Sequence, residues 1–354
     1  MQQRLIVGLV CAATVSGLRV LPSARMCAPM AGPPPGVGGP PPGVGGPPGA
    51  GGPPGAGGPP GGGPPGGPPP RTPAQQLIDT IFEAVFPLLY AFEPDGMLDS
   101  SKNLRVLWVR ALLSSLGKLD DDVAFELLPS ASRWLVGKPF ALLWPAAVTE
   151  KLDWIVKRTT FIDAAVDAFI AIQPAEAPPA QLVLLGSGYD TRALRYGASA
   201  RGRLSFFEVD LPDVVDAKMA IRKRMDTSAG PPPAISMLGC DLNKGAGSVF
   251  ERLQAECGLD PAVPTLVCIE AVLFYLSPPA KSALLGEIST LLAGQPASSL
   301  VLTDNLAPFV RGPMRDAAEG YLSPMGLSLR QHDTLWGGAI QFVEAEAAAG
   351  APSS

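Results

Sequence analysis

Five short apolar runs, separated by segments with a helical pattern, are the feature that most constrains the fold. The runs are rich in Val, Leu and Phe, and they cover residues 181–185, 204–209, 234–238, 265–269 and 299–303. Regular alternation of strands and helices favours a mainly parallel sheet with helices on both faces. The sequence therefore predicts an α/β fold. Residues 334–344 further predict a closing strand pair or an edge strand.

The region before these runs has a helical pattern. From Pro73 to about Ile172, apolar residues recur at intervals of three and four and are interrupted by Pro and Gly. The predicted helices cover residues 75–90, 102–116, 123–128 and 151–172. We therefore expect an N-terminal helical cap region over 74–175 and a core domain over 176–346.

A Gly/Pro-rich stretch precedes the helical region. Eighteen of the 40 glycines and 17 of the 41 prolines lie between Ala31 and Pro70. So few apolar side chains cannot offset the entropy lost on ordering the chain. A collagen triple helix is disfavoured because the spacing of one glycine in three breaks at Pro42 and Pro64. We interpret residues 29–73 as a disordered linker.

The first residues are typical of a targeting segment. Arg4 precedes an apolar run over 5–15, and Ser16 and Gly17 follow it, as in a secretory signal peptide. The run is shorter than the roughly 20 residues that a membrane-spanning helix needs. No acidic residue occurs before Asp79, which also fits a two-part plastid transit peptide. Residues 1–28 thus predict an organelle-targeted, plastid-like or secretory protein with no membrane span when mature, or a cytoplasmic one if they are no address.

Charge and composition exclude several classes of function. Residues 1–70 hold three arginines and no acid, so the remainder carries 24 basic and 32 acidic residues, a net charge of −8. A negative domain is a poor candidate for binding nucleic acid or an anionic membrane. The chain has one histidine, His332, and its five cysteines form no CxxC pair. We therefore predict no metal site and no disulfide framework.

Residues that follow the first two apolar runs indicate an adenosine-containing cofactor. Gly186 and Gly188 follow the first run, and glycines there allow a tight turn close to a ligand. Asp210 ends the second run, where a carboxylate can accept both hydroxyls of a ribose. Alone, the glycines also fit a plain turn, and Asp210 fits a surface carboxylate or a helix cap before Pro212. Their combination in this order favours the cofactor.

The identity of the cofactor follows from the next motifs. A dinucleotide fingerprint needs a third glycine where Thr191 stands, which disfavours NAD. S-adenosylmethionine has no pyrophosphate and does not need that glycine. Asp241, before Leu242, could accept from the adenine amine or cap a helix. Glu270 ends an apolar run, so it either faces the cationic end of the cofactor or forms an internal ion pair.

These residues resemble the leucine carboxyl methyltransferase family of S-adenosylmethionine-dependent enzymes, in particular its bacterial and algal relatives. The resemblance covers most of 98–345 and rests on Arg158 with FID at 161–163, LLGSGYDTRALRY at 184–196, FFEVDLPDVVDAK at 206–218, DL at 241–242 and IEAVLFYLSP at 269–278. It implies a class I methyltransferase, Rossmann-like fold. It implies cofactor contacts at six positions: Arg158, Gly186, Asp210, Asp241, Leu242 and Glu270. Lys102 matches a family lysine only loosely. Thr191-Arg192 and the N-terminus depart from the members that act on a phosphatase tail.

The chemistry favours a carboxylate acceptor and a methyl ester product. A carboxylate has a reference pKa near 4, so it is already an anion at neutral pH and needs no general base. Positioning and desolvation would then supply most of the catalysis, and we assign no catalytic residue. Arg192 and Arg195 are candidates to hold an anionic small-molecule or peptide acceptor, or else they lie in solvent. The stretch 336–338 and the helical half are expected to form the acceptor lid.

Two other functions remain open from the sequence. The chain would be an NAD-binding oxidoreductase if the glycines bound a dinucleotide. It would be a non-catalytic cofactor-binding module if it had kept the fold and lost turnover.

Overall fold

The computed structural model describes residues 101–349 except 129–132, 135, 138–139, 145–148, 151, 175, 200–201, 224, 226–232, 246–247, 296 and 308. All described residues belong to one compact unit, Phe86–Ser354. The predicted targeting segment 1–28, linker 29–73 and helix 75–90 lie outside the described residues.

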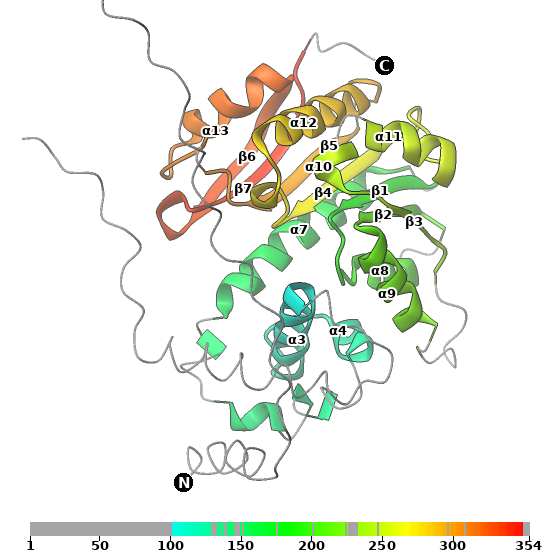
Figure 1. Ribbon diagram of the computed structural model, residues 1–354, viewed down its shortest axis with the longest axis vertical. Helices are drawn as coiled ribbons and strands as arrows, with labels where there is room; N and C mark the ends of the chain where they lie inside the picture. Colours follow the sequence, from blue (N-terminus) through cyan, green and yellow to red (C-terminus); the bar gives the residue numbers. More distant parts are fainter. Residues whose placement is uncertain are drawn as a thin grey trace, which may run out of the picture. The chain divides into compact units, whose positions relative to one another are not determined.

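A seven-stranded sheet forms the centre of this unit (Figure 1). The strands are β1 Ala180–Leu185, β2 Leu204–Asp210, β3 Ile235–Gly239, β4 Thr265–Glu270, β5 Ser299–Asp304, β6 Leu327–Leu335 and β7 Ile340–Ala347. Their order is β3-β2-β1-β4-β5-β7-β6. Strands β1 to β5 are parallel, and β7 pairs antiparallel with both of its neighbours, β5 and β6. This confirms the predicted mainly parallel, Rossmann-like sheet. The order reverses between β1 and β4, which is where ligands bind in such sheets.

The two closing strands differ from their predicted bounds. The sequence predicts a strand pair or edge strand over 334–344, whereas β6 begins at Leu327 and the turn to β7 lies at Trp336–Gly338. The cause is the position of β6 at the edge of the sheet. Residues from Arg330 to Leu335 are exposed or only half-buried, so they do not form an apolar run.

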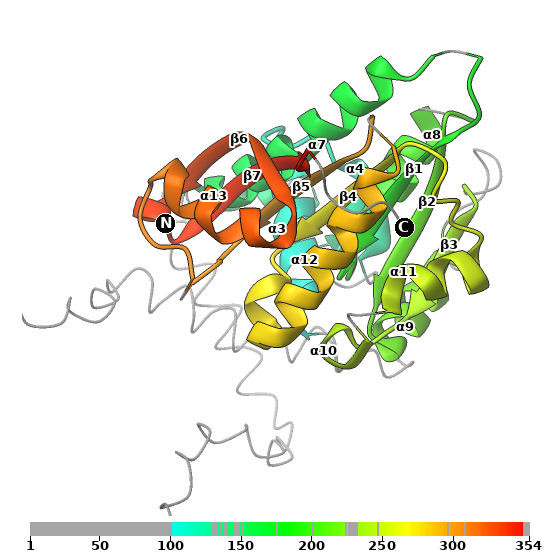
Figure 2. The same ribbon diagram turned by 90° about the horizontal axis from the view of Figure 1, so that it is seen from above.

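Helices cover both faces of the sheet (Figure 2). On one face, α7 (Asp153–Ile172) and α8 (Arg192–Ser199) pack on β1, β2, β4 and β5. On the other, α11 (Val249–Arg252), α12 (Pro278–Ala293) and α13 (Arg315–Leu322) pack on the sheet. Two further helices, α9 (Pro212–Arg222) and α10 (Leu242–Gly245), follow β2 and β3. The apolar residues of α7 therefore pack on the sheet. The sequence pattern instead assigns this helix to the helical cap region.

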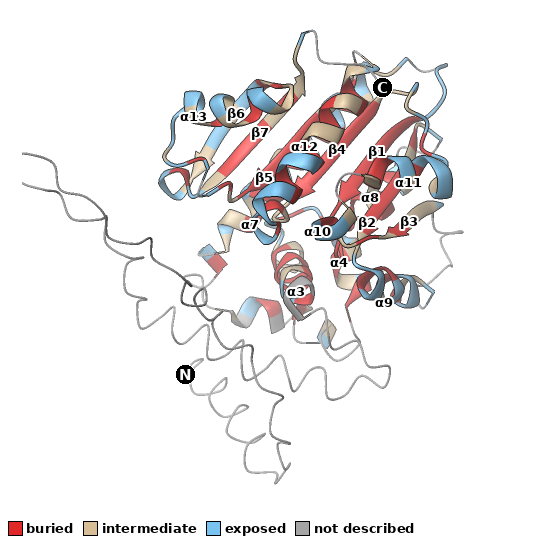
Figure 3. Ribbon diagram, turned by 45° about the horizontal axis from the view of Figure 1, so that its top comes forward, coloured by how far each residue is buried: buried red, intermediate tan, exposed pale blue. Residues whose placement is uncertain are grey.

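The remaining helices lie beside the carboxyl ends of the strands (Figure 1). They are α3 (Ser101–Ser115) and α4 (Asp122–Leu127), both close to their predicted bounds. The side chain of Asp121 caps α4 by accepting from the amide of Ala124. Figure 3 shows the burial that results, with the central strands buried. None of the described helices is long and apolar enough to cross a membrane.

Candidate functional site

The predicted cofactor residues lie along one edge of the sheet. Gly186 follows β1, Asp210 ends β2, Asp241 follows β3 and Glu270 ends β4. These four strands are neighbours, and all run in the same direction. The structure therefore brings these residues to one edge of the sheet, at the point where the strand order reverses.

The turn after β1 depends on its glycines. Gly186 has φ +63° and Gly188 has φ +45°, in the left-handed region that favours glycine. A Cβ on Gly186 would stand 2.3 Å from Cγ2 of Val272, in the loop after β4. The first glycine therefore lets two loops of the edge approach each other closely, a packing role that sequence reasoning did not assign.

Asp210 is held by backbone amides on both oxygens. Its Oδ2 accepts from Gly188 N at 2.6 Å, and its Oδ1 accepts from Leu211 N at 2.7 Å. Burial raises the pKa of Asp210, while the two amide bonds partly oppose this. A carboxylate oxygen has two acceptor sites, so each oxygen keeps one for a ribose hydroxyl. The amides thus hold the carboxylate at the strand end, and Asp210 does not cap α9, since that helix has no side-chain cap.

Glu208, two residues earlier, has a different environment. Its Oε2 lies 2.7 Å from Nζ of Lys218 on α9, and both side chains are about 1% exposed. This buried ion pair joins β2 to α9. Glu208 is thus occupied by Lys218, and the assignment of the cofactor contact to Asp210 stays a prediction.

Asp241 and Leu242 stand where β3 leads into α10. Oδ1 of Asp241 accepts from Asn243 N at 3.0 Å, and Oδ2 lies 3.1 Å from Nζ of Lys244. The hydrogen bond to Lys244 lowers the pKa of Asp241. Leu242 is buried. Asp241 thus fits the helix-capping alternative, and this arrangement leaves its side chain partly exposed at the edge.

Glu270 forms internal ion pairs. Oε1 lies 3.0 Å from Nη2 of Arg158, and Oε2 lies 2.7 Å from Nη1 of Arg192. Burial alone would raise the pKa of Glu270, but the nearby arginine charges outweigh it and hold the pKa at about 2. The carboxylate is therefore ionised at neutral pH. Of the two expectations for Glu270, the structure shows the internal ion pair. This pair fixes Glu270 and Arg158 next to each other.

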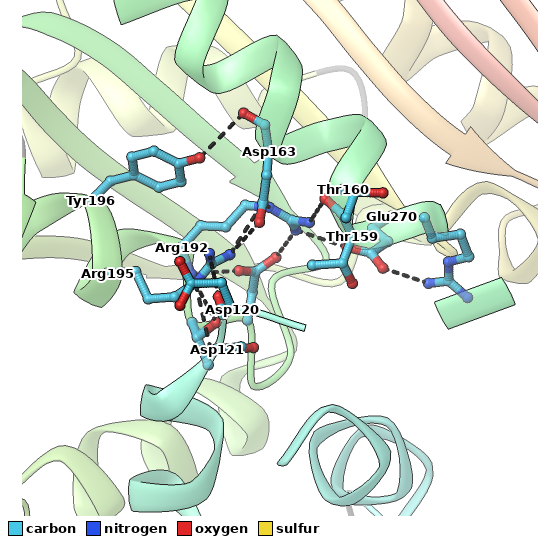
Figure 4. Close-up of polar contacts among 12 residues, drawn as sticks. Asp120, Asp121, Thr159, Thr160, Asp163, Arg192, Arg195, Tyr196 and Glu270 are labelled. Carbon is cyan, nitrogen blue, oxygen red and sulfur yellow. Dashed lines mark hydrogen bonds and ion pairs between the residues drawn. The ribbon is translucent and has the colours of Figure 1, made fainter. Parts of the chain in front are cut away.

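Arg192 is the centre of a larger buried network (Figure 4). Its guanidinium contacts Asp163 at 2.7 Å and Asp190 at 2.5 Å, and donates to the carbonyl oxygen of Thr159 at 3.2 Å. The side chain is fully buried. Burial would lower the pKa of Arg192, but the surrounding carboxylates raise it well above its usual range. Arg192 therefore does not lie in solvent, which corrects that expectation, and its guanidinium is already paired with three carboxylates.

Arg195 and Arg110 connect this network to the helical region. Nη2 of Arg195 lies 2.9 Å from Asp163, and its Nη1 donates to the carbonyl oxygen of Asp120. Arg110 on α3 donates from Nη2 to Oγ1 of Thr191 at 2.8 Å, and pairs with Asp121 at 2.7 Å. Arg195 is thus mostly buried and already paired with Asp163, so it does not lie in solvent. Sequence reasoning missed Arg110, although its apolar neighbours Val109 and Ala111 are a sign of burial.

Asp304, at the end of β5, supports the loop after Glu270. It accepts from the amides of Val272 and Leu273, each at 2.7 Å, and from Phe274 at 3.2 Å. Burial raises the pKa of Asp304 to about 6 although these bonds oppose it. The loop needs such support because Ala271 has φ +59°. The sequence signal was present, since Asp304 follows an apolar run as Glu270 does.

An aromatic pair adjoins Arg158. The rings of Trp154 on α7 and Trp336 in the β6–β7 turn have centroids 5.6 Å apart. The guanidinium carbon of Arg158 lies 5.0 Å from the Trp154 ring centroid. The predicted acceptor lid at 336–338 thus contacts a helix that also carries a cofactor candidate.

Comparison with protein families gives a match to leucine carboxyl methyltransferase over residues 103–289. The chain belongs to this family. The match spans α3 to α12 and includes the edge residues described above. It confirms the predicted family, the class I methyltransferase fold and the family's cofactor, S-adenosylmethionine.

Individual relatives agree with the family. A provisionally named S-adenosyl-L-methionine-dependent methyltransferase of Mycolicibacterium smegmatis is 32% identical over 194 residues, 52% of this chain and 58% of the relative. One from Parafrankia sp. is 33% identical over 196 residues, 55% of this chain and 56% of the relative. Homo sapiens tRNA wybutosine-synthesizing protein 4 is 32% identical over 189 residues, 47% of this chain and 27% of that protein. The chain spans about half the length of the first two relatives and less of the third.

Proposed function

We propose that this chain transfers the methyl group of S-adenosylmethionine to a carboxylate and forms a methyl ester. The observation that carries the proposal is the alignment of Gly186, Asp210, Asp241 and Glu270 at the carboxyl ends of four neighbouring strands. The family assignment adds the cofactor and the reaction class. The activity of the whole protein and its acceptor belong to this proposal.

The residues of the edge fit the parts of the cofactor. Asp210 would accept the ribose hydroxyls, and Gly186 and Gly188 would allow close backbone approach to the cofactor; the amide bonds of Asp210 and the positive φ of the two glycines support this. Asp241 and Leu242 would contact adenine, through a carboxylate oxygen and an apolar side chain.

Arg158 and Glu270 suit the amino-acid end of the cofactor. Nε of Arg158 is buried and has no hydrogen-bond partner among the described residues, and it can donate to a carboxylate. The ionised Glu270 and Asp190 favour an ammonium group. When bound, the cofactor supplies the methyl group on a cationic sulfur.

A carboxylate acceptor fits the proton chemistry of the site. Asp190 and Glu270 have lowered pKa values, so they are weak bases. Asp304 is buried and accepts three backbone amides. His332 bonds Gln341 through Nε2 at 2.6 Å. An acceptor that is already ionised has no proton to lose, so it needs none of these groups as a general base.

Calorimetry tests the proposal against its alternatives. We expect S-adenosylhomocysteine to bind the full-length chain, and NAD to bind far more weakly or not at all. Thr191, at the place of the third dinucleotide glycine, is fully buried and accepts from Arg110. Transfer of label from methyl-labelled cofactor to carboxylic acids then separates an enzyme from a non-catalytic module. Preferred binding of NAD would overturn the proposal.

The assignments for the first residues and for the regions are also proposals. We propose that residues 1–28 direct the chain to a plastid-like organelle or the secretory pathway, and that the helical region 74–175 covers the acceptor side of the core 176–346. The location of a fluorescent fusion with and without residues 1–28 tests the first. Identical locations for both fusions would contradict it.

A further inference from the structure

A row of four residues crosses the sheet sideways from Glu270. Glu270 on β4 pairs with Thr303 on β5, Thr303 pairs with Phe342 on β7, and Phe342 pairs with Asp333 on β6. Neighbouring strands lie about 5 Å apart, so Phe342 stands roughly 10 Å from Glu270 along the row. The row connects the proposed cofactor edge with the far side of the sheet.

The row lies on the face that α7 covers. Cys268 and Val301, two residues before Glu270 and Thr303, belong to the core between α7 and the sheet, and alternate residues of a strand share a face. The ring of Phe342 packs at 90° on Phe161 of α7, with centroids 5.3 Å apart. Arg158, one turn earlier on α7, bonds Glu270. One helix thus touches the row at both Glu270 and Phe342.

A groove of about 360 Å³ lies at the far end of this row. Residues of α7 and of the β6–β7 hairpin line it: Lys157, Thr160, Phe161, Asp333, Thr334, Leu335 and Phe342. Three of these are large apolar side chains, and the two charged ones have opposite signs. Its volume is within the range of small-ligand pockets. The lining favours an apolar body with no net charge over a second ionised group.

Trp336 follows Leu335, a residue that lines the groove, and its backbone has a costly conformation. Its side chain is 60% exposed, and its φ of +53° lies in a region that bulky residues rarely adopt. Gly338 packs closely on the backbone of Gly312, since a Cβ on Gly338 would stand 2.1 Å from the carbonyl oxygen of Gly312. This contact fixes the turn. Backbone strain of this kind is concentrated at active sites and ligand clamps, so we assign the exposed side of the Trp336 ring a ligand contact.

We propose that this groove and Trp336 bind the body of the acceptor, and that the acceptor is an elongated small-molecule carboxylic acid with an apolar or aromatic tail. This inference rests on the proposed function. The acceptor carboxylate lies at the cofactor edge. Thr303 and Phe342 are buried under α7, so the tail passes outside this core, along Trp154 and Trp336, into the groove. Trp154 links the two ends, since it packs on both Trp336 and Arg158.

Binding to the full-length chain saturated with S-adenosylhomocysteine tests the groove without any need for turnover. We expect 5-phenylpentanoate to bind about tenfold or more tightly than benzoate, because its four methylene groups leave water. Suberate, of similar length but charged at both ends, should bind more weakly than 5-phenylpentanoate. Equal affinity for the three acids would overturn the groove as the acceptor site.

Two variants assign the effect to Trp336. Trp336→Ala should weaken 5-phenylpentanoate binding about fivefold to tenfold, while the affinity for S-adenosylhomocysteine and benzoate stays unchanged. Ile172→Ala removes another exposed apolar side chain, 62% exposed at the other end of α7, and should change none of these values. An undiminished preference of Trp336→Ala for 5-phenylpentanoate over benzoate would contradict the proposal.

The same acids separate this inference from the proposed function. Length-dependent binding without any methyl ester would support the groove and contradict the methyl transfer. Methyl ester formation on short and long acids alike would support the transfer and contradict the groove.

Discussion

Arg192 and Glu270 form a buried ion pair, with Nη1 of Arg192 2.7 Å from Oε2 of Glu270. The arginine is fully buried, while Glu270 also pairs with Arg158. Glu270 ends β4, and Arg192 begins α8, the helix that follows β1. The pair therefore joins the ends of the two neighbouring strands between which the strand order reverses. A motif that reads as an exposed helix start in the sequence is therefore the electrostatic centre of the site.

Removing the Arg192 charge should destabilise the fold strongly. Arg192→Met leaves several carboxylates buried without their partner, and we expect a loss of about 3–5 kcal/mol in the free energy of unfolding. Urea unfolding measures it. Arg252→Met is the matched control, because Arg252 and Glu256 form an exposed pair and the loss there should be below about 1 kcal/mol. Similar losses in both variants would contradict the central role of Arg192.

Gly186→Ala should lower the stability of the fold by more than the strain of its positive φ alone explains. Gly202 has a similar φ, +75°, but its Cβ would meet nothing within 4 Å, whereas that of Gly186 meets Val272 at 2.3 Å. Gly202→Ala should cost about 1–2 kcal/mol from strain, and Gly186→Ala clearly more by thermal unfolding. Adding Val272→Ala should restore part of the difference. No rescue would show that the loop contact is unimportant.

Asp210 and Glu208 should separate cofactor binding from stability. Asp210→Ala removes a charged acceptor, so we expect S-adenosylhomocysteine to bind about 30-fold to 100-fold more weakly. Glu208→Ala leaves Lys218 buried and unpaired, which should lower the melting temperature and leave the affinity nearly unchanged. Calorimetry and thermal unfolding measure the two quantities. Equal losses of affinity would mean that the wrong acid was assigned to the ribose.

Stability should fall as the pH rises from 5 to 8. The pKa of Asp304 is raised to about 6 and that of Glu287 to about 7, both mainly by burial. A raised carboxyl pKa favours the folded state below the unfolded pKa near 4, and this contribution is lost as the pH passes the folded pKa. The loss should be on the order of 2 kcal/mol. Glu287→Gln should flatten the profile, and a stability that rises over this range would contradict both assignments.

The strands could be predicted because burial leaves a direct mark on the sequence. Strands β1, β2, β4 and β5 are largely buried on both faces, so each is an apolar run, while β3, at one edge, is mostly half-buried. The predicted bounds of all five agree with the structure to within one residue. The edge strand β6 has exposed positions at Arg330, Gln331 and Asp333, and its beginning was missed for that reason.

The site could be predicted only in part. Gly186, Asp210 and Glu270 were found because they follow apolar runs, where a polar residue stands out. Arg110 and Arg192 were not assigned their buried positions, because an arginine in a helix normally lies in solvent. The carboxylates that pair with them are distant in the sequence, apart from Asp190, two residues before Arg192. Contacts such as Arg110 to Thr191 join residues 81 positions apart.

The release of methanol from the labelled product tests whether the acceptor is a carboxylate and the product a methyl ester. The full-length chain is incubated with methyl-labelled S-adenosylmethionine and 5-phenylpentanoate, and the product is treated with mild alkali. A methyl ester releases volatile labelled methanol, whereas an ether does not. We expect base-labile label in the wild type and most of this turnover in His332→Ala, because the His332 side chain bonds only Gln341 among the described residues. A base-stable product, or loss of turnover in His332→Ala, would contradict the carboxylate acceptor.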